Sequence, residues 1–492
     1  MEHPFCHFDK DDPGVYHNTL RPLPRRLLDV SRLREGENPK LIETHGESGL
    51  YVALSHRWGG AVITQTTQAN YHLHQREIPL SQMCRTFQEA AAMTATLKFD
   101  YIWIDSLCII QDSEQDWLSE SASMADVYSN AVITLSAAAA VSGDTGLLLH
   151  RDAGTTVCMP YFDADEIESG EFWISKFRPD DFEAEVANGP LNKRGWTLQE
   201  RVLSPHIIHF GRTQRLWECQ STIWQESDRQ DHTSLSRFDG NLTSGYFKQL
   251  RSMSWKEYDQ LGKRLPMTST EFSTWYRLIE QFSKRSLTKE EDTLAAISGL
   301  ARVFGERRKD AYIAGLWEND IATGLLWTGG QPLHKPKTWR APSWSWASVT
   351  ADIDFESGWD GQPRVSNVVS VTDPILSPYG PIKSGHLELT GRTVPVQGIP
   401  EDRTVAARSW RKSTMLLDCG LQETSGSVHA LSVFDVDVGF RPFAPSVLDV
   451  RNNLTWALLL TSISVDVYER IGLAEMDREI FEKARERRIT IV

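Results

Sequence analysis

The sequence lacks the features of a secreted, disulfide-bonded or membrane-spanning protein. Its six cysteines are scattered and none belongs to a Cys-x-x-Cys pair, so we expect neither a disulfide framework nor a zinc site. The longest apolar stretch, around residues 456–460, is far shorter than the ~20 residues that a membrane-spanning helix needs. No charged segment followed by an apolar run marks a secretory signal. We therefore expect a cytoplasmic protein with no metal, no bound cofactor and no membrane span.

Positive charge is also scarce, because 52 Lys and Arg residues stand against 66 Asp and Glu residues, for a net charge of −14. An acidic surface repels phosphate backbones, which argues against nucleic-acid binding. The dinucleotide fingerprint, the P-loop, the nucleophile elbow and the His-Glu-x-x-His zinc motif are all missing. His206 and His209 enclose two isoleucines in an expected strand, so we do not interpret them as metal ligands.

Hydrophobic periodicity predicts an α/β fold in the first half of the chain. Apolar runs at 50–54, 101–104 and 131–135 are typical of buried strands. Helical spacing of apolar residues over 81–97 and 112–128 places a helix between each pair of strands. Strands that alternate with helices predict a parallel sheet covered by helices.

Composition divides the rest of the chain into regions. We expect an N-terminal arm over 1–48, the α/β domain over 49–210 with an insertion at about 139–192, a mainly helical region over 211–338, and a Trp-rich, β-rich C-terminal region over 339–492, closed by a helix near 474–487. The chain has 17 tryptophans, and the cluster Trp339, Trp344 and Trp346 is expected in a core or at an interdomain seam.

Polar residues follow the first two expected strands, which end at Ser55 and just before Asp105. Ligands of open parallel sheets bind at the carboxyl ends of the strands. Ser55, Arg57 and Asp105 would then form a binding site for a sugar-phosphate ligand, with Trp58 beside them and Gly59 allowing a close backbone approach. An Arg57–Asp105 ion pair that only stabilises the sheet edge is an equally weighted alternative.

Trp196 and Glu200 are four residues apart and share one face of an expected helix. An apolar wall raises the pKa of a carboxyl group, and an indole ring can stack on a flat ligand. Glu200 could therefore hold ribose hydroxyls and stabilise an oxocarbenium-like state. From spacing alone the favoured alternative is structural: Glu200 pairs with Arg194, Arg201 or Arg57, and Trp196 belongs to the core.

Three segments, 51–59, 101–112 and 194–204, read YVALSHRWG, YIWIDSLCIIQD and RGWTLQERVLS. In this order they resemble the three blocks of the fungal heterokaryon-incompatibility (HET) domain. His56 stands where the family has Tyr. Ile110 stands where it has Asn, which puts any polar role of that position in doubt.

The resemblance implies a role in non-self recognition between fused hyphae that ends in programmed cell death. It also implies distant kinship with the Toll/interleukin receptor (TIR) domain, an α/β fold that signals by self-assembly and in some members cleaves NAD. In those enzymes the catalytic Glu stands four residues after a Trp, a spacing that Trp196 and Glu200 repeat. NAD would then be a substrate, and Glu200 the catalytic residue.

Two main hypotheses about function stay open, beside a weaker third one, suggested by Ile110, in which the protein is a degraded or regulatory member of the family. The first is an assembly-activated NAD glycohydrolase with Glu200 as its carboxylate and Ser55, Arg57, Trp58, Asp105 and Trp196 around the substrate. The second is a non-enzymatic adaptor that self-assembles through the HET domain and recruits an incompatibility partner protein.

Overall fold

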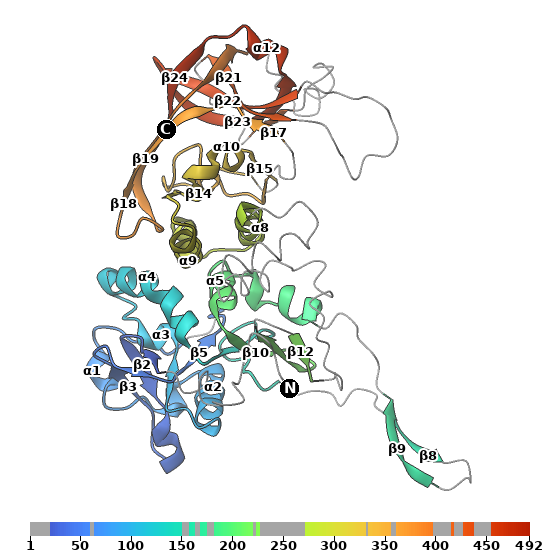
Figure 1. The fold of residues 1–492 in the computed structure, drawn as a ribbon. Helices are drawn as coiled ribbons and strands as arrows, with labels where there is room; N and C mark the ends of the chain where they lie inside the picture. The colour runs from blue at the N-terminus through green and yellow to red at the C-terminus, as the bar shows by residue number, and fades with distance from the viewer. Residues whose placement is uncertain are drawn as a thin grey trace. The chain divides into compact units, whose positions relative to one another are not determined.

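The computed structural model describes residues 20–59, 63–149, 157–162, 168–174, 182–219, 223–226, 271–330, 333–355, 361–396, 415–417, 427–436 and 454–492. The chain divides into two compact units, Met1–Ser252 and Met253–Val492, coloured blue to green and yellow to red (Figure 1). Most of the segment 211–270, where a mainly helical region is expected to begin, lies outside the described residues.

The first unit is built on a sheet of mixed direction. Its described strands follow the order β12-β11-β10-β7-β5-β6-β2-β3. The four middle strands run parallel: β10 (His206–Phe210), β7 (Ile133–Ser136), β5 (Val52–Ser55) and β6 (Tyr101–Trp103). Antiparallel strands extend both sides: β11 (Arg215–Cys219), β12 (Ile223–Gln225), β2 (Arg26–Asp29) and β3 (Lys40–Glu43). The predicted α/β fold is thus confirmed.

The sheet reaches further along the chain in both directions than the expected strands do. Within residues 1–48 we expected an arm with little structure. Instead β2 and β3 join the sheet, where Leu27 and Leu28 of β2 become fully buried. Leu28 pairs in register with Ile102 of β6. Beyond residue 210, β11 and β12 continue the sheet.

The two faces of the sheet are covered by different helices. Side chains alternate along a strand, so Val52 and Leu54 of β5 share one face. That face packs on α2 (Arg85–Thr96), where Phe87 and Ala91 lie at helical spacing in the same core cluster. The opposite face is covered by α4 (Glu114–Asn130) and α5 (Trp196–Leu203). On this face the ring of Trp103 on β6 contacts Tyr128 of α4 edge-on.

The strand order reverses between β5 and β7. From β5 the chain passes to β6 on one side and then returns to β7 on the other side. In open α/β sheets this switch point opens a crevice at the carboxyl ends of the two strands, which is where ligands bind. Ser55 and Ser136 end these strands as register partners.

The second unit combines helices with a ring of strands, which confirms the expected β-rich region. α8 (Glu271–Ser283) and α9 (Ser298–Arg308) precede it. Pairings close a ring of β19 (Ile382–Pro395), β21 (Val428–Val436), β22 (Leu454–Ser464), β23 (Val467–Asp477) and β24 (Glu486–Ile491). The helix expected near 474–487 is wrong: only α12 (Glu479–Glu482) is helical, because residues 474–477 pair with β22.

The expected tryptophan core lies within the second unit. Trp344 and Trp346 are buried, and the indole of Trp327 donates a hydrogen bond to the Trp344 carbonyl at 2.9 Å. Trp346 donates to the carbonyl of Gly315, where a Cβ would lie 2.4 Å from the Trp346 ring. The expectation fails for Trp339, which is 54% exposed.

Candidate functional site

A layer of polar side chains lies at the carboxyl edge of the parallel strands. Ser55, Ser136 and His209 occupy equivalent positions on β5, β7 and β10. Their neighbours Leu54 and Leu135 point to the opposite, α2-covered face and belong to its apolar core. The polar side chains therefore gather on the face that α5 covers.

Glu200 reaches this layer from α5. Its side chain is only 5% exposed, and its Oε2 accepts a hydrogen bond from the Ser55 hydroxyl. The hydroxyl of Tyr128 on α4 also bonds the carboxyl group, and it lies 3.1 Å from the Leu54 carbonyl oxygen, to which it can donate. Glu200 makes no ion pair with any described residue, so hydroxyl groups rather than a cation hold it in place.

Burial raises the pKa of Glu200 to about 7. The positive charge of Arg194 and the hydrogen bonds from Ser55 and Tyr128 act in the opposite direction, and the negative charge of Asp105 adds to the increase. A carboxyl group with this pKa is present in both protonation states near neutral pH. Such a group suits general acid or base chemistry.

Asp105 supplies a second, partly exposed carboxylate at the start of α3 (Asp105–Cys108). It accepts hydrogen bonds from the indole of Trp58 at 3.0 Å and from the Ser106 backbone at 2.6 Å. The His56 Nε2 atom lies 3.6 Å from its Oδ1. Burial lowers the pKa of His56 to about 4, so this ring is neutral at pH 7.

Two residues of the expected site behave differently from the sequence-based interpretation. Arg57 is half-buried and forms no hydrogen bond or ion pair with the part of the chain that the structure describes. The alternative Arg57–Asp105 ion pair is therefore not formed. Gly59 has a positive φ of 64°, and a Cβ there would lie 2.7 Å from Ser142 Cβ. Its close approach is made to the chain itself.

Trp196 is half-buried and lies edge-on to Trp117, with ring centroids 6.4 Å apart. Arg194, just before α5, donates to the His56 carbonyl and so links this helix to the end of β5. Arg201 pairs with Glu218 instead of Glu200. The structure thus brings Ser55 to Glu200 and Trp58 to Asp105, while Arg57 and Trp196 take no part in these contacts.

Sequence reasoning missed a buried network beside Glu200. His209 lies 3.0 Å from the Ser136 hydroxyl and 2.9 Å from Glu218, whose same oxygen accepts from Arg201 at 2.8 Å. The guanidinium of Arg201 also lies over the ring of Phe182. A signal was present in the sequence: polar residues alternate with apolar ones in strands that are otherwise buried.

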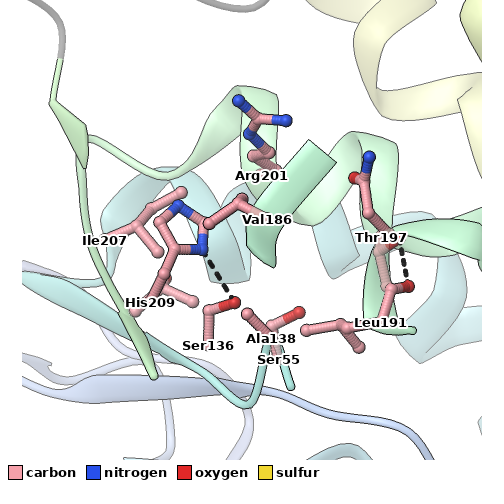
Figure 2. A pocket seen from close by; sticks show the side chains of 11 residues that line it. Ser55, Ser136, Ala138, Val186, Leu191, Thr197, Arg201, Ile207 and His209 are labelled. Atoms are coloured by element: carbon pink, nitrogen blue, oxygen red, sulfur yellow. Dashed lines mark hydrogen bonds between the residues drawn. The ribbon is translucent and has the colours of Figure 1, made fainter. Parts of the chain in front are cut away.

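A cavity lies under α5, between Ser55, which bonds Glu200, and the network of Ser136 and His209. Figure 2 shows the side chains that line it, with the hydrogen bond between Ser136 and His209; Ser55, Thr197 and Arg201 also contribute. Its volume is about 20 Å³. A cavity of this size holds about one water molecule. The site is therefore closed to a nucleotide in this conformation.

The fold and the site define an α/β domain with a buried carboxyl group at the strand switch point. Residues 51–200 match the family model described as heterokaryon incompatibility protein (HET). The match begins beside β5 and ends at Glu200, so it contains every residue of the expected site. The chain therefore carries a HET domain over these residues.

No curated protein and no solved structure matches the chain. In the described ranges, no helix is both long and apolar enough to cross a membrane. Nor do the described residues contain a group of three or more His, Cys, Asp or Glu side chains that could hold a metal ion.

Proposed function

We propose that the HET domain of this protein hydrolyses the N-glycosidic bond of NAD or a related nucleotide, and that this reaction serves non-self recognition and regulated cell death. One observation carries the proposal: Glu200 is buried at the switch point of the sheet with a pKa of about 7. Strongly perturbed pKa values are concentrated at functional sites.

The residues around Glu200 have separate tasks in this reaction. Cleavage of a glycosidic bond builds positive charge at the anomeric carbon, which an ionised carboxylate stabilises. Ser55 holds the Glu200 carboxyl group in position through its hydrogen bond. Asp105 and Arg57, both partly exposed at the same edge, would contact the ribose hydroxyls and the phosphates. Water accepts the ribosyl group when the nicotinamide leaves.

The reaction requires the site to open. Glu200 is 5% exposed and the neighbouring cavity has room for about one water molecule, so the single chain corresponds to a resting state. Assembly of several HET domains would shift the population toward an open state that admits the nucleotide. Turnover is then expected to rise more steeply than in proportion to protein concentration.

The second candidate is a non-enzymatic adaptor that assembles and recruits a partner protein. The same burial favours it, because a carboxyl group bonded by two hydroxyls in a closed site is also a stable structural element. In that case Glu200 would fix α5 on the sheet, and signalling would depend on the outer surface of the domain.

The experiment that tests the proposal measures NAD loss over a range of concentrations of the purified full-length protein. Glu200→Gln is the diagnostic variant, because the amide oxygen can still accept the Ser55 hydrogen bond while the titratable group is lost. Glu114→Gln, an exposed change at the start of α4, is the matched control. We expect turnover that rises steeply with wild-type concentration, is lost in Glu200→Gln and is kept in Glu114→Gln. Equal turnover in both variants, or none at any concentration, would contradict catalysis by Glu200.

A further inference from the structure

The buried network beside Glu200 contains a hydroxyl group, an imidazole ring and a carboxylate in sequence. The Ser136 hydroxyl lies 3.0 Å from His209 Nδ1, and His209 Nε2 lies 2.9 Å from Glu218 Oε2. The same Glu218 oxygen accepts a hydrogen bond from Arg201 Nε at 2.8 Å. All four residues are buried. A base that reaches a hydroxyl group and is itself oriented by a third group is the arrangement that activates nucleophiles in enzymes.

The direction of the hydrogen bonds in this network follows from Glu218. An ionised carboxylate only accepts hydrogen bonds, so His209 Nε2 carries the ring hydrogen and donates it to Glu218. A neutral ring leaves the charges of Arg201 and Glu218 balanced in the buried network. Nδ1 of a neutral ring is then an acceptor, and the Ser136 hydroxyl donates its one hydrogen to it.

The cavity that Ser136 lines has the size and the polarity of a water site. Its volume of about 20 Å³ is room for about one water molecule. Ser55 and Ser136 line it as register partners on neighbouring strands (Figure 2). Neighbouring strands lie about 4.8 Å apart, a gap that one water molecule spans with two hydrogen bonds of about 2.8 Å. Since Ser55 donates its hydrogen to Glu200 and Ser136 donates its own to the imidazole, the water donates to both serines.

Arg201 supplies a third partner for this water. It lines the same cavity, and its Nη2 atom is buried without a hydrogen-bond partner in the part of the chain that the structure describes. A buried donor is normally satisfied by protein or by ordered water. A water that accepts from Arg201 and donates to two serines makes three hydrogen bonds, the usual number for a buried water, and keeps one lone pair. The positive charge beside it favours the loss of a proton.

We propose that this cavity binds the water molecule that attacks the ribosyl group, and that His209 takes its proton through Ser136. The inference rests on the proposed hydrolysis, to which it adds the group that accepts the proton. Nicotinamide leaves with both electrons of the C–N bond, and the water oxygen forms the new C–O bond at the anomeric carbon. The water proton passes to the Ser136 oxygen while the Ser136 proton passes to His209 Nδ1, so the ring becomes an imidazolium ion that Glu218 stabilises. Release of that proton to solvent restores the network.

The test compares two reactions of the full-length protein with NAD: hydrolysis, and exchange of nicotinamide for added 3-acetylpyridine. The pyridine nitrogen has no proton to lose, so exchange needs Glu200 but no proton acceptor. We expect Ser136→Ala to lower the ratio of hydrolysis to exchange about 100-fold, because a general base typically contributes 10²–10⁴-fold. His209→Gln should lower it in the same direction. Ser123→Ala, which removes an exposed hydroxyl group on α4, is the matched control and should keep the wild-type ratio. Circular dichroism checks that all variants are folded.

A high-resolution crystal structure of the wild type tests the water site without turnover. We expect one ordered water within hydrogen-bond distance of Ser136 Oγ and Arg201 Nη2. A dry cavity would overturn the inference, whether or not NAD is consumed. An equal ratio of hydrolysis to exchange in wild type and Ser136→Ala would also overturn it, while Glu200 remained the catalytic carboxylate. If the wild type consumes NAD in neither reaction, the proposed function fails together with the catalytic role of the water, and an ordered water there is structural.

Discussion

The two faces of the central sheet use the same strands for different purposes. On the α2 face, Leu54, Leu135 and Phe87 pack into an apolar core. On the α5 face, Ser55 and Ser136 stand at the equivalent edge and meet Glu200 and His209. Successive residues of a strand point to opposite faces of the sheet. Leu54 and Leu135 therefore belong to the apolar layer, whereas the next residues, Ser55 and Ser136, belong to the polar layer.

The difference shows where the domain gains stability and where it gives some up. Burial of apolar side chains stabilises the α2 face by about 25 cal/mol for each Å² removed from water. On the α5 face, burial of Glu200 raises its pKa to about 7, which means that the folded state holds a proton that the unfolded chain would release. Such a cost is typical of sites kept for chemistry or for a switch.

The largest effect is expected from breaking the apolar face. Phe87→Ala removes a fully buried ring and leaves a cavity, which should lower the free energy of unfolding by about 3–5 kcal/mol. Chemical denaturation followed by fluorescence measures the loss. Leu97→Ala, next to the same helix and 40% exposed, is the control and should cost much less. Equal losses in the two variants would mean that the α2 face is not the core.

A smaller effect should appear on the polar face when pH is varied. The Glu200 pKa is raised from 4.5 to about 7, so its contribution to stability is complete below pH 4.5 and disappears as pH rises through 7. This window corresponds to about 3 kcal/mol of unfolding free energy. We expect the stability difference between wild type and Glu200→Gln to shift by most of this amount between pH 5 and pH 8, because the window begins at pH 4.5. Denaturation of both proteins at the two pH values measures it.

The titration of His56 does not disturb that measurement. Its pKa is lowered to about 4, so its contribution is lost as pH falls from 6.5 toward 4, in the direction opposite to that of Glu200. Both proteins keep His56, so its effect cancels in the difference. A difference between wild type and Glu200→Gln that does not change with pH would contradict the raised Glu200 pKa.

The smallest effect on stability is expected at the rim of the polar face. Arg57 has no described hydrogen-bond or ion-pair partner, so Arg57→Ala should change the free energy of unfolding by no more than about 0.5 kcal/mol. If the proposed reaction occurs, the same variant should raise KM for the nucleotide. Arg194→Ala, which loses the bond to the His56 carbonyl, should destabilise more and serves as the comparison. A large loss in Arg57→Ala would reveal a structural role for that side chain.

The sequence predicted the parts of the fold that depend on local patterns. Alternating strands and helices gave the α/β class, and the polar residues after two strands located Ser55 and Asp105 at one edge of the sheet. The strands β2 and β3 were missed because the short Leu27–Leu28 pair gains its significance only from packing beside β6. A tertiary pairing of this kind leaves little local periodicity to detect.

The candidate site was predicted less completely. The Trp196–Glu200 spacing drew attention to Glu200, but the contacts of its side chain with Ser55 and Tyr128 depend on how α5 lies over the sheet. Arg201 does not pair with the adjacent Glu200, because neighbouring positions of a helix point in different directions. Its actual partner, Glu218, lies on β11 and could not be predicted, because the pair depends on how α5 packs on the sheet.

The contact between Ser55 and Glu200 joins residues 145 positions apart in the chain. Closing so long a loop costs entropy that the packed sheet must first offset, and contacts of this range form slowly. The polar layer therefore arises late in folding, after α5 has docked. An unfolded copy contains every residue of the layer but not the layer itself.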